Sequence, residues 1–142
     1  MESDSALLAG LTHSIGLSSI LVKAESDPDL LNNTETLKKL IYELYPTVGM
    51  RILKNWGFSE YLIQVPSQHL NIERSGTDGV ADYTDIVQVA LIQTVLGTSH
   101  PLASVDQENV SALDRLRMRD SIEEIHISGG IIEVEEIKAA LL

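Results

Sequence analysis

The segment that most constrains the fold covers residues 82–97, because it is apolar on nearly every side. Its apolar members are Tyr83, Ile86, Val87, Val89, Ala90, Leu91, Ile92, Val95 and Leu96. Their β-branched content favours a strand, but about fifteen residues without Gly or Pro are long for a strand and ordinary for a helix. A helix coated in this way needs other helices around it. The segment therefore predicts the central, buried helix of a helical domain.

The first predicted helix runs from Ala6 to about Ala24, because its apolar residues recur every three or four positions. Gly10 and Gly16 interrupt this pattern, and each glycine costs a helix interior about 1 kcal/mol relative to alanine. We therefore expect another backbone to pack closely against both glycines.

Four shorter segments have helical spacing, and helices are expected over residues 34–44, 46–56, 60–69 and 107–116. Pro46 suits a first turn but not a helix interior, so it separates the first two of these helices. Gly57 ends the helix over residues 46–56 in a left-handed conformation. Pro66 marks a kink or an early end of the helix over residues 60–69. Residues 26–29 predict a turn, and residues 71–80 predict a flexible polar loop.

Residues 121–142 predict one short helix, a break at Gly129-Gly130 and a final amphipathic helix. No segment of the chain demands a strand. We therefore predict an all-α fold, a bundle of about six to eight helices. It forms a single domain over residues 1–142.

The charge balance limits the partners. Ten Lys and Arg residues stand against 21 Asp and Glu residues, which gives a formal net charge of −11 at pH 7. Such a chain repels phosphate backbones and anionic lipids, so we expect no nucleic acid and no membrane among its partners. Polar residues break the apolar stretches near the N-terminus, which argues against a signal peptide or a membrane span. The absence of cysteine fits a reducing compartment, and we expect a cytoplasmic protein.

Three short segments carry a recognisable pattern. Residues 9–16 read Ala-Gly-Leu-Thr-His-Ser-Ile-Gly, residues 48–60 read Val-Gly-Met-Arg-Ile-Leu-Lys-Asn-Trp-Gly-Phe-Ser-Glu, and residues 113–116 read Leu-Asp-Arg-Leu. In this order they resemble the HDOD family, the HD-related output domain, a non-catalytic relative of the HD and HD-GYP phosphohydrolases. The resemblance covers about residues 5–118, and residues 119–142 would form a C-terminal helical extension.

The resemblance also identifies candidate site residues. In HD phosphohydrolases a His-Asp pair, a His-Pro-x-x-Gly segment, a His-His pair and a further Asp on the central helix converge on metal ions. The matching positions here are His13, Ser14, Tyr45, Gln68, His69 and Leu91. Only His13 and His69 keep an imidazole, and two imidazoles leave a hard metal short of the carboxylates it prefers. The resemblance therefore implies a degenerate site with no metal, no cofactor and no catalytic residue.

The resemblance implies a function as well. HDOD domains are helical and non-catalytic, and they work beside receiver, kinase or cyclic-dinucleotide modules of bacterial signalling proteins. We therefore expect a regulatory or interaction domain, not an enzyme. Family domains carry several helices ahead of the His-Asp segment, so this chain resembles the C-terminal half of one. We expect it to pair with a second copy or with the missing N-terminal half.

Two alternatives stay open. The inherited pocket could bind a nucleotide or a cyclic dinucleotide as a sensor, for which the basic residues to inspect are Arg51, Lys54, Arg115, Arg117 and Arg119. The chain could also be a metal-dependent phosphohydrolase with an unusual ligand set built on His13 and His69. Glu123 and His126 have a Glu-x-x-His spacing that occurs once, whereas di-metal sites need two copies. We expect His100 and His126 on the solvated surface.

Overall fold

The computed structural model describes residues 1–75 and 78–119, and these residues form helices and loops without a strand. The predicted all-α class is therefore confirmed. The helices expected within residues 121–142, and with them nearly all of the expected extension over 119–142, lie outside the described residues.

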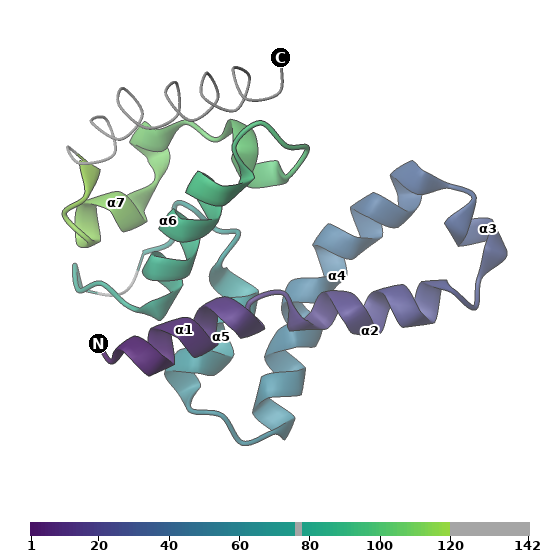
Figure 1. Ribbon diagram of the computed structural model, residues 1–142, viewed down its shortest axis with the longest axis horizontal. Helices are drawn as coiled ribbons and strands as arrows, with labels where there is room; N and C mark the ends of the chain where they lie inside the picture. Colours follow the sequence, from purple (N-terminus) through teal and green to yellow (C-terminus); the bar gives the residue numbers. More distant parts are fainter. Residues whose placement is uncertain (76–77, 120–142) are drawn as a thin grey trace, which may run out of the picture.

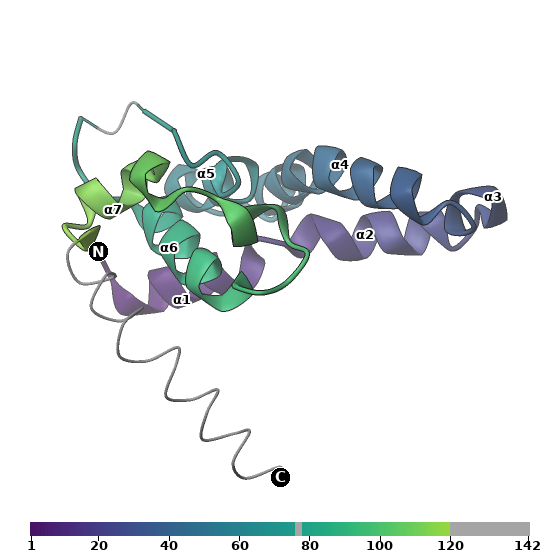
Figure 2. The ribbon, with the colours of Figure 1, turned by 90° about the horizontal axis from the view of Figure 1, so that it is seen from above.

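The described elements follow one another along the chain as α1 (Ser3–Thr12), α2 (Ile15–Ala24), α3 (Pro28–Leu31), α4 (Thr34–Asn55), α5 (Glu60–Gln68), α6 (Tyr83–Val95), the short 3-10 helices η1 (Pro101–Ser104) and η2 (Gln107–Asn109), and α7 (Ser111–Arg115). Figure 1 and Figure 2 show that they form two parts. The arm contains α2, α3 and the N-terminal half of α4. The body contains α1, α5, α6, α7 and the C-terminal half of α4.

Helix α6 lies at the centre of the body, as predicted, because α1, α5, α7 and η1 all pack against it. Tyr83 and Val87 in its first half belong to an apolar cluster shared with α1 and α5. Ile92 and Val95 in its second half belong to another cluster, shared with η1 and α7. The fold therefore buries this helix from several directions, as its apolar coating requires.

The expectation of one continuous helix over residues 6–24 is wrong, because α1 ends at Thr12 and α2 begins at Ile15. The His13 side chain explains the break. Its Nδ1 atom lies 2.5 Å from the carbonyl oxygen of Gly10, the oxygen that would accept the N–H of Ser14 in a continuous helix. A side chain that takes this acceptor competes with the helical hydrogen bond and lets the chain turn.

The expected helix start at Pro46 is also wrong, because α4 runs through this residue without a break. Proline lacks an N–H, so the carbonyl of Tyr42 loses its helical donor. Packing outweighs this loss, since α4 is buried against α2 in the arm and against α5 in the body. Gly57, in contrast, has the predicted left-handed conformation, with φ of 76°.

Smaller corrections concern three loops. Residues 28–31 form the short helix α3 where a turn was expected, and the Asp27 side chain caps it by accepting from the N–H of Leu30 at 3.2 Å. The helix expected over residues 107–116 is divided into η2 and α7. The loop over residues 71–80 is polar as expected, yet Arg74 within it is buried.

The two glycines of the N-terminal helices behave differently. A Cβ atom placed on Gly16 would collide with the carbonyl of Tyr45 and would lie 2.6 Å from the backbone nitrogen of Gly49. The expected close packing is therefore present at Gly16, between α2 and α4. At Gly10 it is absent, since such a Cβ would meet nothing within 4 Å beyond its chain neighbours and the backbone of its own helix.

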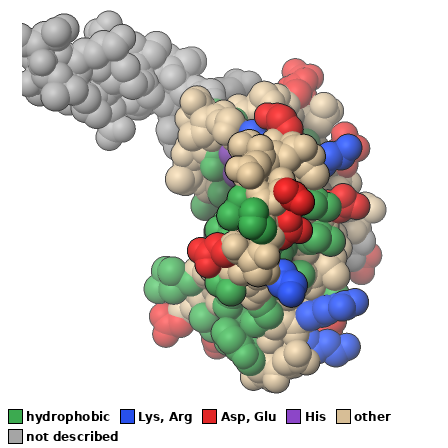
Figure 3. Space-filling model, turned by 90° about the vertical axis from the view of Figure 1, so that its right-hand side faces the viewer, with side chains coloured by type: hydrophobic (Ala, Val, Ile, Leu, Met, Phe, Trp, Pro, Cys, Tyr) green, Lys and Arg blue, Asp and Glu red, His purple; other side chains and the backbone are tan. Residues whose placement is uncertain are grey.

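Several large apolar side chains of α1 and α2 stay exposed. Leu7, Leu11 and Val22 are 65%, 71% and 68% exposed, and Figure 3 shows hydrophobic side chains among acidic ones on the face at the α3 end. By length and composition alone, Ser3–Ala24 could cross a membrane, and 17% of its most apolar window is buried. The structure divides this stretch into two helices that pack on α4, α5 and α6, as helices of a globular domain do.

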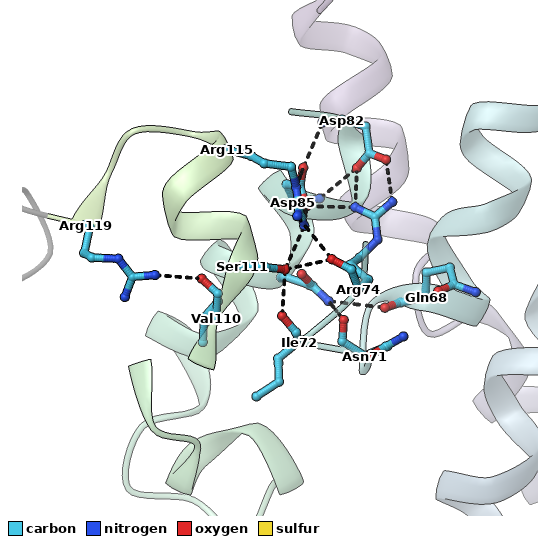
Figure 4. A network of polar contacts seen from close by, with 11 residues as sticks. Gln68, Asn71, Ile72, Arg74, Asp82, Asp85, Val110, Ser111, Arg115 and Arg119 are labelled. Carbon is cyan, nitrogen blue, oxygen red and sulfur yellow. Dashed lines mark hydrogen bonds and ion pairs between the residues drawn. The ribbon is translucent and has the colours of Figure 1, made fainter. Parts of the chain in front are cut away.

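A buried ionic network holds the C-terminal part of the body together (Figure 4). Asp85, which is fully buried, accepts hydrogen bonds from Arg74 at 2.7 Å and from Arg115 at 2.7 and 2.9 Å. Arg74 also pairs with Asp82, the N-cap residue of α6. Burial opposes the charge on Asp85, but the hydrogen bonds from Arg115 and the charges of both arginines outweigh it and lower the pKa of this carboxyl. The network ties Arg74 and α7 to the start of α6.

The glycine contact generates a first prediction. Gly16→Ala should lower the free energy of unfolding by about 1–3 kcal/mol, because the added methyl group meets the α4 backbone at both Tyr45 and Gly49. Gly10→Ala is the matched control, and it should raise the free energy of unfolding by about 0.5–1 kcal/mol through helix propensity. Urea denaturation followed by circular dichroism measures both. Equal effects of the two substitutions would show that α2 and α4 are not in close contact.

The ionic network generates a second prediction. Asp85→Asn should lower the free energy of unfolding by about 3–5 kcal/mol, because it leaves the buried Arg74 and the partly buried Arg115 without their common carboxylate. Asp114→Asn removes the exposed partner of Arg119 and should leave stability nearly unchanged. The measurement is the midpoint of thermal unfolding. A similar midpoint for the two variants would contradict a structural role for the network.

Candidate functional site

Three of the six candidate positions come together where α1, α4 and α5 meet. His13 follows the last residue of α1, His69 follows the last residue of α5, and Tyr45 lies in the middle of α4. The ring centroids of His13 and His69 are 5.1 Å apart, and those of Tyr45 and His69 are 5.5 Å apart. We call these three residues the ring cluster.

Hydrogen bonds fix the state of the His69 ring. Its Nδ1 atom lies 2.8 Å from the carbonyl oxygen of Pro66, which can only accept, so Nδ1 carries the proton and donates. The Nε2 atom of a neutral ring then has a free lone pair, and it accepts a hydrogen bond from the Tyr45 hydroxyl at 2.8 Å. Both ring nitrogens of His69 are therefore engaged inside the protein.

Burial keeps both partners of this hydrogen bond neutral. His69 is fully buried, and this burial, helped by the nearby His13, lowers the pKa of its imidazole to about 4. Burial also raises the pKa of the Tyr45 hydroxyl to about 12, with a smaller contribution from Tyr42. At neutral pH the Tyr45 hydroxyl keeps its proton and donates a hydrogen bond to the imidazole of His69, which stays uncharged.

A cavity of about 490 Å³ opens beside the ring cluster, between α2, α4 and α6. Ser14 and Leu91, two further candidate positions, line it together with His13 and Tyr45. Gln68 is not part of this lining. Its backbone carbonyl instead accepts a hydrogen bond from the Gln88 side chain at 3.2 Å, which joins the end of α5 to α6.

His100 also lines the cavity, so the expectation of a solvated surface position is wrong. Its ring is half-buried and lies edge-on against Tyr42, with centroids 5.7 Å apart. Its Nδ1 atom accepts the N–H of Leu102 at 3.1 Å and so caps η1. Burial lowers the pKa of this imidazole. The His-Pro pair at the start of a turn is the sequence signal that could have indicated this capping position.

The basic residues considered for phosphate binding do not line the cavity. Arg115 is held by Asp85, and Arg119 is paired with Asp114. Arg51 and Lys54 are exposed on α4, and Arg117 is exposed after α7. Lys38 is the basic residue in the lining. Glu123 and His126 lie outside the described residues.

The donor atoms at this site do not suit a divalent metal ion. Across residues 1–75 and 78–119, no group of three or more His, Asp or Glu side chains could hold one. The lone pair that His69 would offer is engaged by Tyr45, and Leu91 has no donor atom. Ser14 offers a neutral hydroxyl where a carboxylate would be needed.

The His69 pair generates a third prediction. In the unfolded chain this imidazole has its usual pKa of 6.5, whereas the folded value is about 4. Between these two values the unfolded chain binds more protons, so the free energy of unfolding should fall as the pH falls, by about 3 kcal/mol in total.

His69→Gln removes the titrating group and serves as the comparison. Urea denaturation of both proteins at pH 7.5, 6 and 5 gives the difference between their free energies of unfolding at each pH. The contributions of the carboxylates cancel in this difference. Parallel pH dependences in the two proteins would show that His69 is not buried in the neutral form.

Comparisons with known proteins support the fold. No protein-family model matches the chain, and no curated protein matches it. Among solved structures, it is similar to a "putative metal-dependent phosphohydrolase" from Shewanella amazonensis SB2B, with a TM-score of 0.67 and 25% sequence identity. The match covers 84% of this chain but spans only 40% of the length of that protein. The fold is thus an HD-like helical bundle, and the finer resemblance to HDOD domains stays a prediction.

Proposed function

We propose that this chain is a non-catalytic regulatory or interaction domain of bacterial signal transduction, of the HDOD type. The observation that carries the proposal is the hydrogen bond from the Tyr45 hydroxyl to the Nε2 atom of His69. A metal ligand has to offer its lone pair to the ion, and here that lone pair is given to a neutral hydroxyl. The similarity to a protein described as a phosphohydrolase supports the common scaffold. It does not transfer the chemistry.

The free-energy cost of breaking the Tyr45–His69 hydrogen bond to bind a metal also supports a non-catalytic role. A metal ion would have to displace the Tyr45 hydroxyl from His69. Burial raises the pKa of this hydroxyl, so it cannot easily become a phenolate ligand instead. The displaced hydroxyl would then stay buried without a partner, at a cost of about 1–3 kcal/mol. Leu91 supplies an apolar surface where the chemistry would need a carboxylate.

The exposed apolar side chains support an interaction role. Leu7 and Leu11 on α1 and Val22 on α2 form apolar faces of the kind that contact other proteins. In a cytoplasmic signalling protein the partners would be receiver, kinase or cyclic-dinucleotide modules, a second copy of this chain, or the N-terminal part of such a domain. The net charge of −11 favours protein partners over nucleic acid or membrane surfaces.

Two other functions have less support. A sensor of nucleotides or cyclic dinucleotides would need cations near the cavity, and of the five basic residues considered none lines it. A phosphohydrolase built on His13 and His69 would need the imidazole that Tyr45 engages. The non-catalytic role therefore agrees best with the geometry.

Metal content and hydrolysis together provide the fourth prediction, which tests this proposal. After incubation with Mn²⁺, Fe²⁺, Ni²⁺ or Zn²⁺ and removal of free metal, the chain should retain no more metal than His13→Ala. Bis(p-nitrophenyl) phosphate should be hydrolysed no faster than by the metal alone. About one ion per chain, lost in His13→Ala and accompanied by turnover, would overturn the proposal.

A second variant identifies the cause. Ser14→Asp combined with Tyr45→His returns one carboxylate and one imidazole to the ring cluster, and it should bind more metal than the parent chain. Circular dichroism confirms that each variant is folded before metal is measured. If the double variant binds no metal while it stays folded, the lost ligands are not the reason why the parent chain lacks metal affinity.

A further inference from the structure

We propose that the cavity between α2, α4 and α6 binds an aliphatic monocarboxylic acid, with the acid group held between His13 and His100. This inference goes beyond the proposed function, which requires no ligand, and it does not depend on it. It rests on the size of the cavity, on its apolar walls and on the hydrogen-bonding state of the two imidazoles.

The cavity has the size and the walls of a small-molecule site. Its volume of about 490 Å³ falls within the range of about 300–1,000 Å³ that is usual for such sites. Aliphatic side chains from three helices form most of its surface, namely Leu17, Leu21, Leu37, Ile41 and Leu91. Walls of this kind favour a hydrocarbon body over a ribose or a base with many polar atoms.

The two imidazoles provide one acceptor and one donor. The Nδ1 atom of His13 donates to the carbonyl of Gly10, so the Nε2 atom of the neutral ring is an acceptor. The Nδ1 atom of His100 accepts from the N–H of Leu102, so its Nε2 atom carries the proton and is a donor. Among residues 1–75 and 78–119, neither Nε2 atom has a hydrogen-bond partner.

A carboxylic acid matches this pair. Its hydroxyl can donate to the Nε2 atom of His13 while its carbonyl oxygen accepts from the Nε2–H of His100. A carboxylate oxygen in the same position can likewise accept from the Nε2–H of His100. The hydrogen bond from His100 is stronger to an ionised carboxylate, because it is then charge-assisted.

The remaining polar lining favours an acid over an amine. The hydroxyls of Tyr42 and Ser14 can donate to a carboxylate, and Lys38 brings an ammonium group to the same cavity. In the part of the chain that the structure describes, Lys38 takes part in none of the ion pairs. One lysine and neutral donors suit a monoanion, whereas phosphate groups are usually held by arginine clusters or several backbone N–H groups.

Calorimetric titration of the full chain with octanoate tests the proposal, with 1-octanol and octylamine as matched probes. We expect about one octanoate per chain, and affinities at least tenfold lower for the alcohol and the amine. His100→Ala should weaken octanoate binding by about tenfold or more, the effect of losing one charge-assisted hydrogen bond. Octanol binding as tightly as octanoate, or an unchanged affinity in His100→Ala, would overturn the assignment of an acid.

Two tryptophan variants locate the binding. Leu21 lines the cavity and is 41% exposed, so Leu21→Trp should fill the cavity and abolish octanoate binding without unfolding the chain. Val22 is its exposed neighbour outside this lining, and Val22→Trp should bind octanoate like the parent chain. If both variants bind equally well, if the parent binds no octanoate, or if a nucleotide displaces octanoate from it, the proposal fails.

Discussion

The close approach of α2 to α4 sets the position of every ring in the site. Gly16 lies against the backbone of Tyr45 and Gly49, and Gly49 in turn lies against Pro66 of α5. Tyr45 is itself one of these contact points, and His13 and His69 are each three residues from one, Gly16 and Pro66. Each ring of the cluster is therefore carried by a residue at, or three residues from, a close contact between helices. Two small residues thus bring three helices close enough for the rings to meet.

The ionic network around Asp85 fixes the other side of the site. It anchors the start of α6 to Arg74 and to α7, and Leu91 lies further along the same helix. The side chain of Gln88 adds a link to the end of α5, where His69 is located. Helix α6 therefore carries one wall of the cavity and is held on both sides by polar contacts. Such contacts define a single register more sharply than apolar packing alone.

Much of this arrangement could be predicted from the sequence, since the apolar coating of residues 82–97 indicates the central helix and the glycine at position 16 indicates close packing. The joining of His13, Tyr45 and His69 follows from the family pattern. The pattern treats Tyr45 as a lost ligand, however, and cannot show that its hydroxyl engages His69. That hydrogen bond depends on the distance between α4 and α5, which no local sequence signal encodes.

Two other features could not be predicted for the same reason. The burial of Arg74 and the contact of His100 with the cavity depend on contacts between segments far apart in the chain. Pro46 inside α4 could not be placed for a different reason, since packing on both sides of it outweighed the local rule that proline begins a helix.

Helix α4 is also the element that continues from the arm into the body. A helix bends most readily where a backbone hydrogen bond is missing. The Tyr42 carbonyl, which lacks its helical donor, belongs to a residue that lines the cavity. Bending of α4 at this point would therefore change the shape of the cavity and the direction of the α3 tip together.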